Sequence, residues 1–209
     1  MARLLSCLGS LVLFSCAMST SSSGGVVERT DVVTTHPAAT PIAPATSCDV
    51  TTATQPAAAR QHRASCSAID YLFVPPAAGN HYDTWADFLT YDAPVPWGFL
   101  VHAMEHGAVV LAYDPESPAA PDVRAAFASL VSAHGLDPIC RAESWPSRFI
   151  VVPAHDLETP IAALAWEHTY EASCLDVPSL STFVEAHYGQ APEALCVPGA
   201  DLSARGWCD

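Results

Sequence analysis

The sequence predicts a single small α+β domain, in which two or three helices pack against a mixed sheet and disulfides brace the fold. Three observations lead to this prediction. Helix and strand patterns alternate through the second half of the chain, half of the 209 residues are apolar, and six cysteines follow an apparent export signal. The expected core has the order strand, helix, strand, strand, helix, which requires both parallel and antiparallel strands.

Residues 1–16, "MARLLSCLGSLVLFSC", have the pattern of a signal peptide. One arginine precedes an apolar run that is too short to span a bilayer. Leu13 lies three residues before Cys16 and Ser15 immediately before it, which resembles a bacterial lipobox. We therefore expect export to the cell envelope, with a lipid attached at Cys16 as the membrane anchor. The alternative is an ordinary cleaved signal and a secreted protein.

Export places the remaining cysteines in an oxidising compartment, where an even number indicates disulfides rather than free thiols. No C-x-x-C spacing favours a thiolate metal site. Local loops suggest the pairs Cys48–Cys66 and Cys196–Cys208, which would leave Cys140 to pair with Cys174. Sequence alone allows 15 pairings of six cysteines, so this pairing is a guess.

Residues 17–65 are rich in Ser, Thr, Pro and Ala, which is typical of a disordered tether. His62 lies in this stretch, and we interpret it as incidental. The globular domain is expected over residues 66–209, with a disulfide-held tail from residue 190 onward.

Apolar periodicity within the domain defines the elements. A short strand or extended lead-in is expected at 68–76, ahead of the regular core. Gly107 and Gly135 are placed to end two of the helices in the left-handed conformation. The segment 160–170 is expected as one strand, although a helix is an alternative. The pattern predicts helices at 98–106, 120–135 and 177–189, and strands at 108–114, 148–154 and 160–170.

The charge of the chain excludes some partners. There is no lysine, and 8 arginines face 22 acidic residues, for a formal net charge of −14. Nucleic-acid binding depends on clustered positive charge, so we expect no nucleic-acid partner. Electrostatic adsorption to an anionic membrane surface is equally disfavoured.

The stretch "WGFLVHAMEHGAVVLAYD" contains the candidate metal ligands. His102 and His106 are four residues apart and would project from one face of a helix, a spacing that suits two ligands of one metal ion. His81, in a turn-forming loop, is the natural third ligand. Such a site suits zinc or copper. The expected supporting partners, which would fix the ring tautomers, are Glu105, Tyr82 and Asp83.

Three other interpretations of these histidines remain open. "HAMEH" fits the H-x-x-E-H protease pattern, with Glu105 as general base and Glu185 as the most plausible third ligand. An extended segment would instead place His102, Met104 and His106 on one face, a copper-like set, although Gly107 favours the helix and a packing role for Met104. The histidines could also be structural, at a polar helix end.

The segment from Pro75 to Pro115 resembles the bacterial domain of unknown function 3105 family. The matching residues are Pro75, Pro76, Gly79, His81, His102, Glu105, His106, Gly107, Tyr113 and Pro115. Ala78 and Met104 stand where the family often has serine and leucine. The resemblance covers about residues 70–194 and implies membrane-anchored or secreted proteins. It supplies no activity, but it implies that His81 and the 102–106 pair belong to one constellation.

The sequence therefore predicts an extracytoplasmic, lipid-anchored domain that binds copper or zinc through His81, His102 and His106. One alternative is a non-catalytic envelope domain that binds a protein or cell-wall component. The other is a zinc-dependent hydrolase that uses Glu105 as its base.

Overall fold

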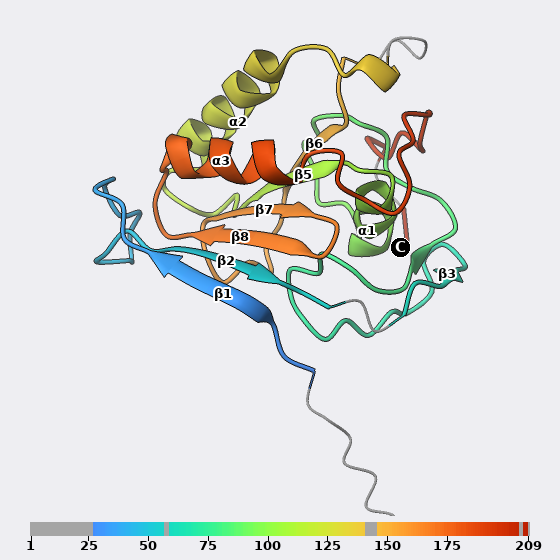
Figure 1. Cartoon of the computed structure of the whole chain (residues 1–209), viewed down its shortest axis with the longest axis horizontal. Coiled ribbons are helices and arrows are strands. Elements are labelled where there is room, and N and C mark those ends of the chain that lie inside the picture. The colour runs from blue at the N-terminus through green and yellow to red at the C-terminus, as the bar shows by residue number, and fades with distance from the viewer. Residues whose placement is uncertain (1–26, 57–58, 141–145, 205–206, 209) are drawn as a thin grey trace, which may run out of the picture.

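A six-stranded sheet lies at the centre of the computed structural model, which describes residues 27–56, 59–140, 146–204 and 207–208 (Figure 1). Its strands run in the order β1-β2-β8-β7-β5-β6, and every neighbouring pair is antiparallel except β5 and β6. The strands are β1 (Thr30–Thr35), β2 (Val50–Thr54), β5 (Val109–Tyr113), β6 (Phe149–Pro153), β7 (Ile161–Ala165) and β8 (His168–Ala172).

Helices cover both faces of this sheet. The helices α2 (Ala120–His134) and α3 (Val177–His187) lie together over one face, and α1 (Trp97–Glu105) lies against the other (Figure 1). All five residues of β5 are buried, because the strand is covered on both sides. A 3-10 turn spans Pro138–Cys140, and a separate parallel pair consists of β3 (His62–Arg63) and β4 (His81–Tyr82). In the part of the chain described, no helix is both long and apolar enough to cross a membrane.

The α+β class and the mixed sheet are confirmed, and the predicted helices are present. The segment 160–170 differs, because it forms the hairpin β7–β8 rather than one strand. Its two-residue turn contains Glu167 at φ +64°, a left-handed conformation that Gly or Asn usually adopts in such turns. No glycine marks this turn in the sequence. Residues 68–76 form no strand.

The expected tether also differs from the structure. Residues 30–35 and 50–54 form β1 and β2, which extend the sheet beyond β8. Both segments are rich in threonine and valine, whose β-branched side chains favour strands. The composition of the whole stretch obscures this local preference. The expected signal peptide and the lipidation site at Cys16 lie outside the described residues.

Three disulfides brace the domain, as predicted, but none of the expected pairs forms. The bonds join Cys48 to Cys174, Cys66 to Cys208 and Cys140 to Cys196. All three span long stretches of chain. The pairing of β2 with β8 brings Cys48 near Cys174, and an isolated bridge between Ala86 and Ala200 shows that the tail lies against the 62–86 region. The local loops that we expected do not close. Three disulfides indicate an extracytoplasmic protein.

Candidate metal site

The end of helix α1 positions two of the candidate ligands. His102 and Glu105 are three residues apart and lie on one face of the helix. The helix ends immediately afterwards, because the backbone N–H groups of Gly107 and Ala108 donate to the carbonyls of Met104 and Ala103. This Schellman motif requires a left-handed residue, which Gly107 supplies at φ +91°. The predicted helix and its glycine stop are both present.

A buried arginine fixes this helix end. Arg148 Nη1 donates to the carbonyl oxygen of His106 at 2.8 Å, and its Nε pairs with the Asp137 carboxylate at 2.8 Å. The positive charge lies beside carbonyls at the negative end of the helix dipole. A Cβ at Gly107 would approach Arg148 Nη1 to 2.4 Å, so only glycine fits here. The last turn of α1 is therefore held firmly.

The loop histidine points into the protein beside this turn. His81 is completely buried, and its Nδ1 lies 2.9 Å from the carbonyl oxygen of Gly79. Gly79 has φ +118°, a conformation that residues with a side chain rarely adopt. Since a carbonyl oxygen only accepts, Nδ1 carries the proton and Nε2 of the neutral ring carries a lone pair. His102 follows the same rule, with Nδ1 2.7 Å from the carbonyl oxygen of Tyr82.

A third imidazole comes from His62, which the sequence led us to treat as incidental. Strand β3 pairs in parallel with β4, and this register sets His62 directly opposite His81. The His62 ring lies 4.9 Å from the His81 ring and 4.8 Å from the His102 ring, centroid to centroid. Unlike the other members, His62 is exposed.

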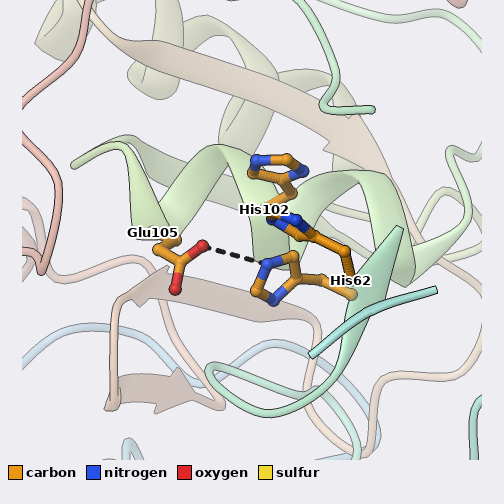
Figure 2. A group of neighbouring side chains, drawn as sticks. His62, His102 and Glu105 are labelled. Carbon is orange, nitrogen blue, oxygen red and sulfur yellow. Dashed lines mark ion pairs between the residues drawn. The ribbon is translucent and has the colours of Figure 1, made fainter. Parts of the chain in front are cut away.

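Together these side chains form a group of three histidines and one glutamate that could hold a metal ion. One potential ligand atom from each of His62, His81, His102 and Glu105, which we call the histidine–glutamate group, lies within 4.8 Å of every other (Figure 2). The dashed line in Figure 2 joins His81 Nε2 and Glu105 Oε2, which are 2.9 Å apart and form an ion pair only when the ring is protonated. A neutral ring with its proton on Nδ1 has no hydrogen on Nε2 to donate, so His81 Nε2 is a buried nitrogen with no hydrogen-bond partner among the described residues.

Burial keeps the inner rings neutral. Desolvation lowers the pKa of His81 and, with a further contribution from His106, lowers the pKa of His102 to about 4. Desolvation also lowers the pKa of His106 to about 4. Only the neutral imidazole offers a lone pair to a metal ion, so these rings are in the form that binds metal near neutral pH.

His106, which the sequence predicted as a ligand, is not a member of the histidine–glutamate group. Its ring is 4.7 Å from that of His102, but its Nε2 lies 3.3 Å from Oε2 of Glu193, in the tail of the domain. Its ring also packs edge-on against Trp85. The four-residue spacing does make the two histidines neighbours. However, His106 is the C-terminal cap of α1, and its ring is turned toward the tail.

The supporting residues also differ from the prediction. Glu105 lies among the potential ligands rather than behind them. Tyr82 supports His102 through its backbone carbonyl, while its hydroxyl donates to Ser67. Asp83 is exposed and accepts a hydrogen bond from Ser65, away from the rings. Met104 is fully buried in the core, consistent with packing.

The geometry also bears on the protease pattern. Glu185, the expected third protease ligand, is exposed on α3 and lines a groove between α2 and α3 with His134. It is not a member of the histidine–glutamate group. The four-residue spacing in "HAMEH" therefore makes His102 and His106 neighbours at the end of one helix, and of these two histidines only His102 belongs to the histidine–glutamate group.

One family matches the chain. The "Protein of unknown function (DUF3105)" family matches residues 62–198, more than half of the sequence. The chain belongs to the DUF3105 family. This confirms the resemblance inferred from the 75–115 segment, and the matched region begins at His62 and includes every member of the histidine–glutamate group. No curated protein and no solved structure matches the chain.

No signal in the sequence alone identified His62 as a member of the group. It lies 19 residues before His81, in a stretch whose composition resembles a linker. Its position depends on the short β3–β4 pair and on the Cys66–Cys208 disulfide that follows it. The start of the DUF3105 match at residue 62 is the one feature that includes this histidine in the domain.

Proposed function

We propose that this DUF3105 domain binds one divalent ion, copper or zinc, through His62, His81, His102 and Glu105. One observation carries the proposal: the buried Nε2 of His81 has no hydrogen-bond partner in the described part of the chain and faces a carboxylate oxygen 2.9 Å away. The Nδ1–H of that ring is already donated to Gly79. Two electron-rich atoms at this distance need a proton or a metal ion between them or beside them, because an unsatisfied buried polar atom costs about 1–3 kcal/mol. Burial lowers the pKa of His81 and so disfavours the proton, which supports a metal ion.

The donor set favours borderline transition metals. Three imidazoles and one carboxylate suit zinc or copper, whereas magnesium and calcium prefer oxygen ligands throughout. Four ligands at about 2.1 Å from a tetrahedral ion lie roughly 3.4 Å from one another. The observed spread of up to 4.8 Å therefore requires only a small contraction of the group. Copper binds more tightly than zinc to such ligands where both are available.

The hydrogen bonds behind the rings support a ligand role. His81 and His102 each donate Nδ1–H to a backbone carbonyl, which leaves Nε2 directed into the group. Second partners of this kind fix the tautomer and orientation of metal-binding histidines. If the two rings had only a structural role, nothing would explain why both direct Nε2 into the same group. Glu105, when it serves as a ligand, is not free to act as the general base of a hydrolase.

We also propose that the domain acts in the cell envelope, anchored by a lipid on Cys16. The three disulfides favour an oxidising compartment. The "LFSC" sequence provides the acceptor cysteine. A mass shift of the mature N-terminus that disappears in Cys16→Ser tests this anchor. An unmodified mature chain that starts elsewhere would leave the protein secreted.

The metal site is tested by elemental analysis and competition titration of the purified chain with zinc and with copper(II). We compare the wild type with His102→Ala, Glu105→Gln and His106→Ala. The structure-based ligand set predicts that the first two variants lose stoichiometric binding and that His106→Ala retains it. His36→Ala is the matched control, because His36 is an exposed histidine paired with Asp49 outside the group. Circular dichroism verifies that each variant is folded.

Two results would contradict the proposal. If the wild type binds neither ion stoichiometrically, the histidine–glutamate group is not a zinc or copper site. If His106→Ala abolishes binding while Glu105→Gln does not, the ligand set expected from the sequence is the correct one.

A further inference from the structure

We propose that His62 is the exchangeable ligand of the site, and that the coordination position it occupies is where the ion enters, leaves and accepts an outside donor. This inference rests on the proposed metal-binding function. It adds that His81, His102 and Glu105 form the permanent part of the site. The protein would then be suited to take up an ion and pass it on.

Exposure separates the four side chains into two classes. The side chains of His81, His102 and Glu105 lie in the interior, with 0%, 3% and 7% of each residue exposed. Both residues of β3, which carries His62, are exposed. An ion bound to the three inner side chains would therefore be covered by protein, and His62 would be its one exposed ligand.

The local structure around the inner ligands is also firmer. His102 and Glu105 belong to a helix whose end is capped by Arg148, and His81 is held through Gly79. His62, by contrast, belongs to a strand of two residues whose sole partner within the two-stranded sheet is β4. Elements with few buried contacts and exposed hydrogen bonds are the ones that open locally at low free-energy cost.

The segment that carries His62 is held at a few points. Backbone bonds join His81 to Gln61 and Asp83 to Arg63, and side-chain bonds join Asn80 to Gln61 and Ser65 to Asp83. The Cys66–Cys208 disulfide follows four residues after His62. These bonds return the ring to the same position after each opening. Displacement of His62 therefore needs only a short segment to move, while the disulfide keeps the segment near the site.

Ligand exchange at this position is chemically simple. The bond between the ion and the His62 nitrogen breaks, and a bond to an incoming neutral nitrogen donor forms, with no change in oxidation state. An imidazole-type donor fits best, since it replaces the lost ring with the same chemistry. The chemical class of ligand that we assign to the opened position is therefore an exogenous imidazole, either free in solution or on an acceptor protein.

The test uses the full mature chain loaded with cobalt(II), a spectroscopic substitute for zinc, and with zinc itself. We compare His62→Ala with His102→Ala, and His36→Ala is again the control. Visible absorption of the cobalt form reports the coordination of the ion. Transfer of zinc to a chromogenic chelator in a stopped-flow instrument reports the rate at which the ion leaves.

We expect His62→Ala to retain one ion per chain and to release zinc at least about tenfold faster, since even loss of an outer-shell partner weakens metal binding about 10–100-fold. Added imidazole should change the cobalt spectrum of His62→Ala and slow zinc release, while the wild type responds much less. His102→Ala should lose stoichiometric binding, and imidazole should not restore it.

The outcomes separate the two proposals. No stoichiometric binding by the wild type would overturn the metal-binding function itself. Stoichiometric wild-type binding with an unchanged release rate in His62→Ala would show that His62 is not a ligand. If His62→Ala loses the ion as completely as His102→Ala, His62 is a permanent ligand. Either of these last two results would overturn the inference and leave metal binding in place.

Discussion

His102 Nδ1 donates a 2.7 Å hydrogen bond to the carbonyl oxygen of Tyr82, and this bond couples helix α1 to strand β4. The same two elements meet again one turn earlier, where Gly98 lies under the Tyr82 ring. A methyl group at Gly98 would approach ring atoms of Tyr82 to 2.6 Å. The orientation of a proposed ligand therefore depends on a close packing contact elsewhere on its own helix.

The substitution Gly98→Ala should weaken both the fold and the site. Alanine normally stabilises a helix by about 1 kcal/mol relative to glycine. Here the clash with a ring that cannot bend away should outweigh that gain, at a net cost of about 1–3 kcal/mol in the free energy of unfolding. The displaced Tyr82 carbonyl should also lower metal affinity.

Urea denaturation measures the stability change, and competition with a zinc chelator measures the affinity. Ser129→Ala, on the exposed face of α2, serves as the control for a change to alanine within a helix. A Gly98→Ala variant as stable as the wild type would show that the contact between Gly98 and the Tyr82 ring does not constrain the fold.

The part of the site on α1 could be predicted because it is local. A three-residue spacing on a helix that a glycine ends is enough to place His102 and Glu105 together. His106 has the same local signal, yet its Nε2 lies beside Glu193 and its ring packs edge-on against Trp85. Those partners come from a tail and a loop whose positions depend on tertiary contacts.

His62 could not be predicted for a related reason. Its approach to His81 requires β3 and β4 to pair across the 17 intervening residues 64–80, which form no helix or strand. The sheet shows the same limit. The strands 109–113 and 149–153 are continuous buried β-branched and apolar runs, whereas β1 and β2 are threonine-rich segments within a linker-like composition. Continuous apolar runs therefore identify buried strands, whereas the threonine-rich strands β1 and β2 become recognisable only through their long-range pairing with β8.

The buried pair Arg148–Asp137 should be essential for stability. Their side chains are 6% and 4% exposed, and Tyr188 donates a second hydrogen bond to the same Asp137 oxygen. Arg148→Met should cost about 3–5 kcal/mol, because it leaves an uncompensated buried carboxylate. Urea denaturation of the metal-free protein measures this loss.

A second arginine–aspartate pair provides the matched control. Arg124 and Asp92 form an ion pair at the surface, with side chains 45% and 83% exposed. Arg124→Met should change the free energy of unfolding by only about 0–1 kcal/mol, since solvent screens the pair. Equal effects of the two substitutions would contradict the idea that burial makes the first pair important.

Stability should depend on pH through a histidine far from the metal site. Desolvation, with a further contribution from His168, lowers the pKa of His187 to about 4 from its ordinary value of 6.5. Between these pH values the unfolded chain binds a proton that the native chain does not. The free energy of unfolding should therefore rise with pH across this window and be fully present above it.

The variant His187→Leu removes this contribution and should reduce the slope of stability against pH between about 4 and 6.5, while His102 and His106, whose pKa values are also lowered to about 4, keep part of the slope in both proteins. In the wild type the His187 ring stacks on the His168 ring, with the centroids 4.0 Å apart, and Glu167 and Asp31 lie near His168. The stability of the variant is therefore compared with that of the wild type at each pH. Metal-free protein is used at each pH. Parallel curves for the two proteins over the whole range would show that His187 titrates alike in the folded and unfolded states.

Two of the disulfides allow a separation of stability from site geometry. Cys66–Cys208 and Cys48–Cys174 span 142 and 126 residues, so removing either should cost a similar amount of stability, about 2–5 kcal/mol. Only Cys66 lies close to His62, whereas Cys48 and Cys174 lie beside β2 and β8.

We therefore expect the variant Cys66→Ala/Cys208→Ala to release zinc faster, as His62→Ala does, and Cys48→Ala/Cys174→Ala to retain the wild-type release rate. Both variants are compared at a temperature where circular dichroism shows each to be folded. If the two lose zinc equally fast, the disulfide after His62 contributes to general stability and does not hold the ligand in place.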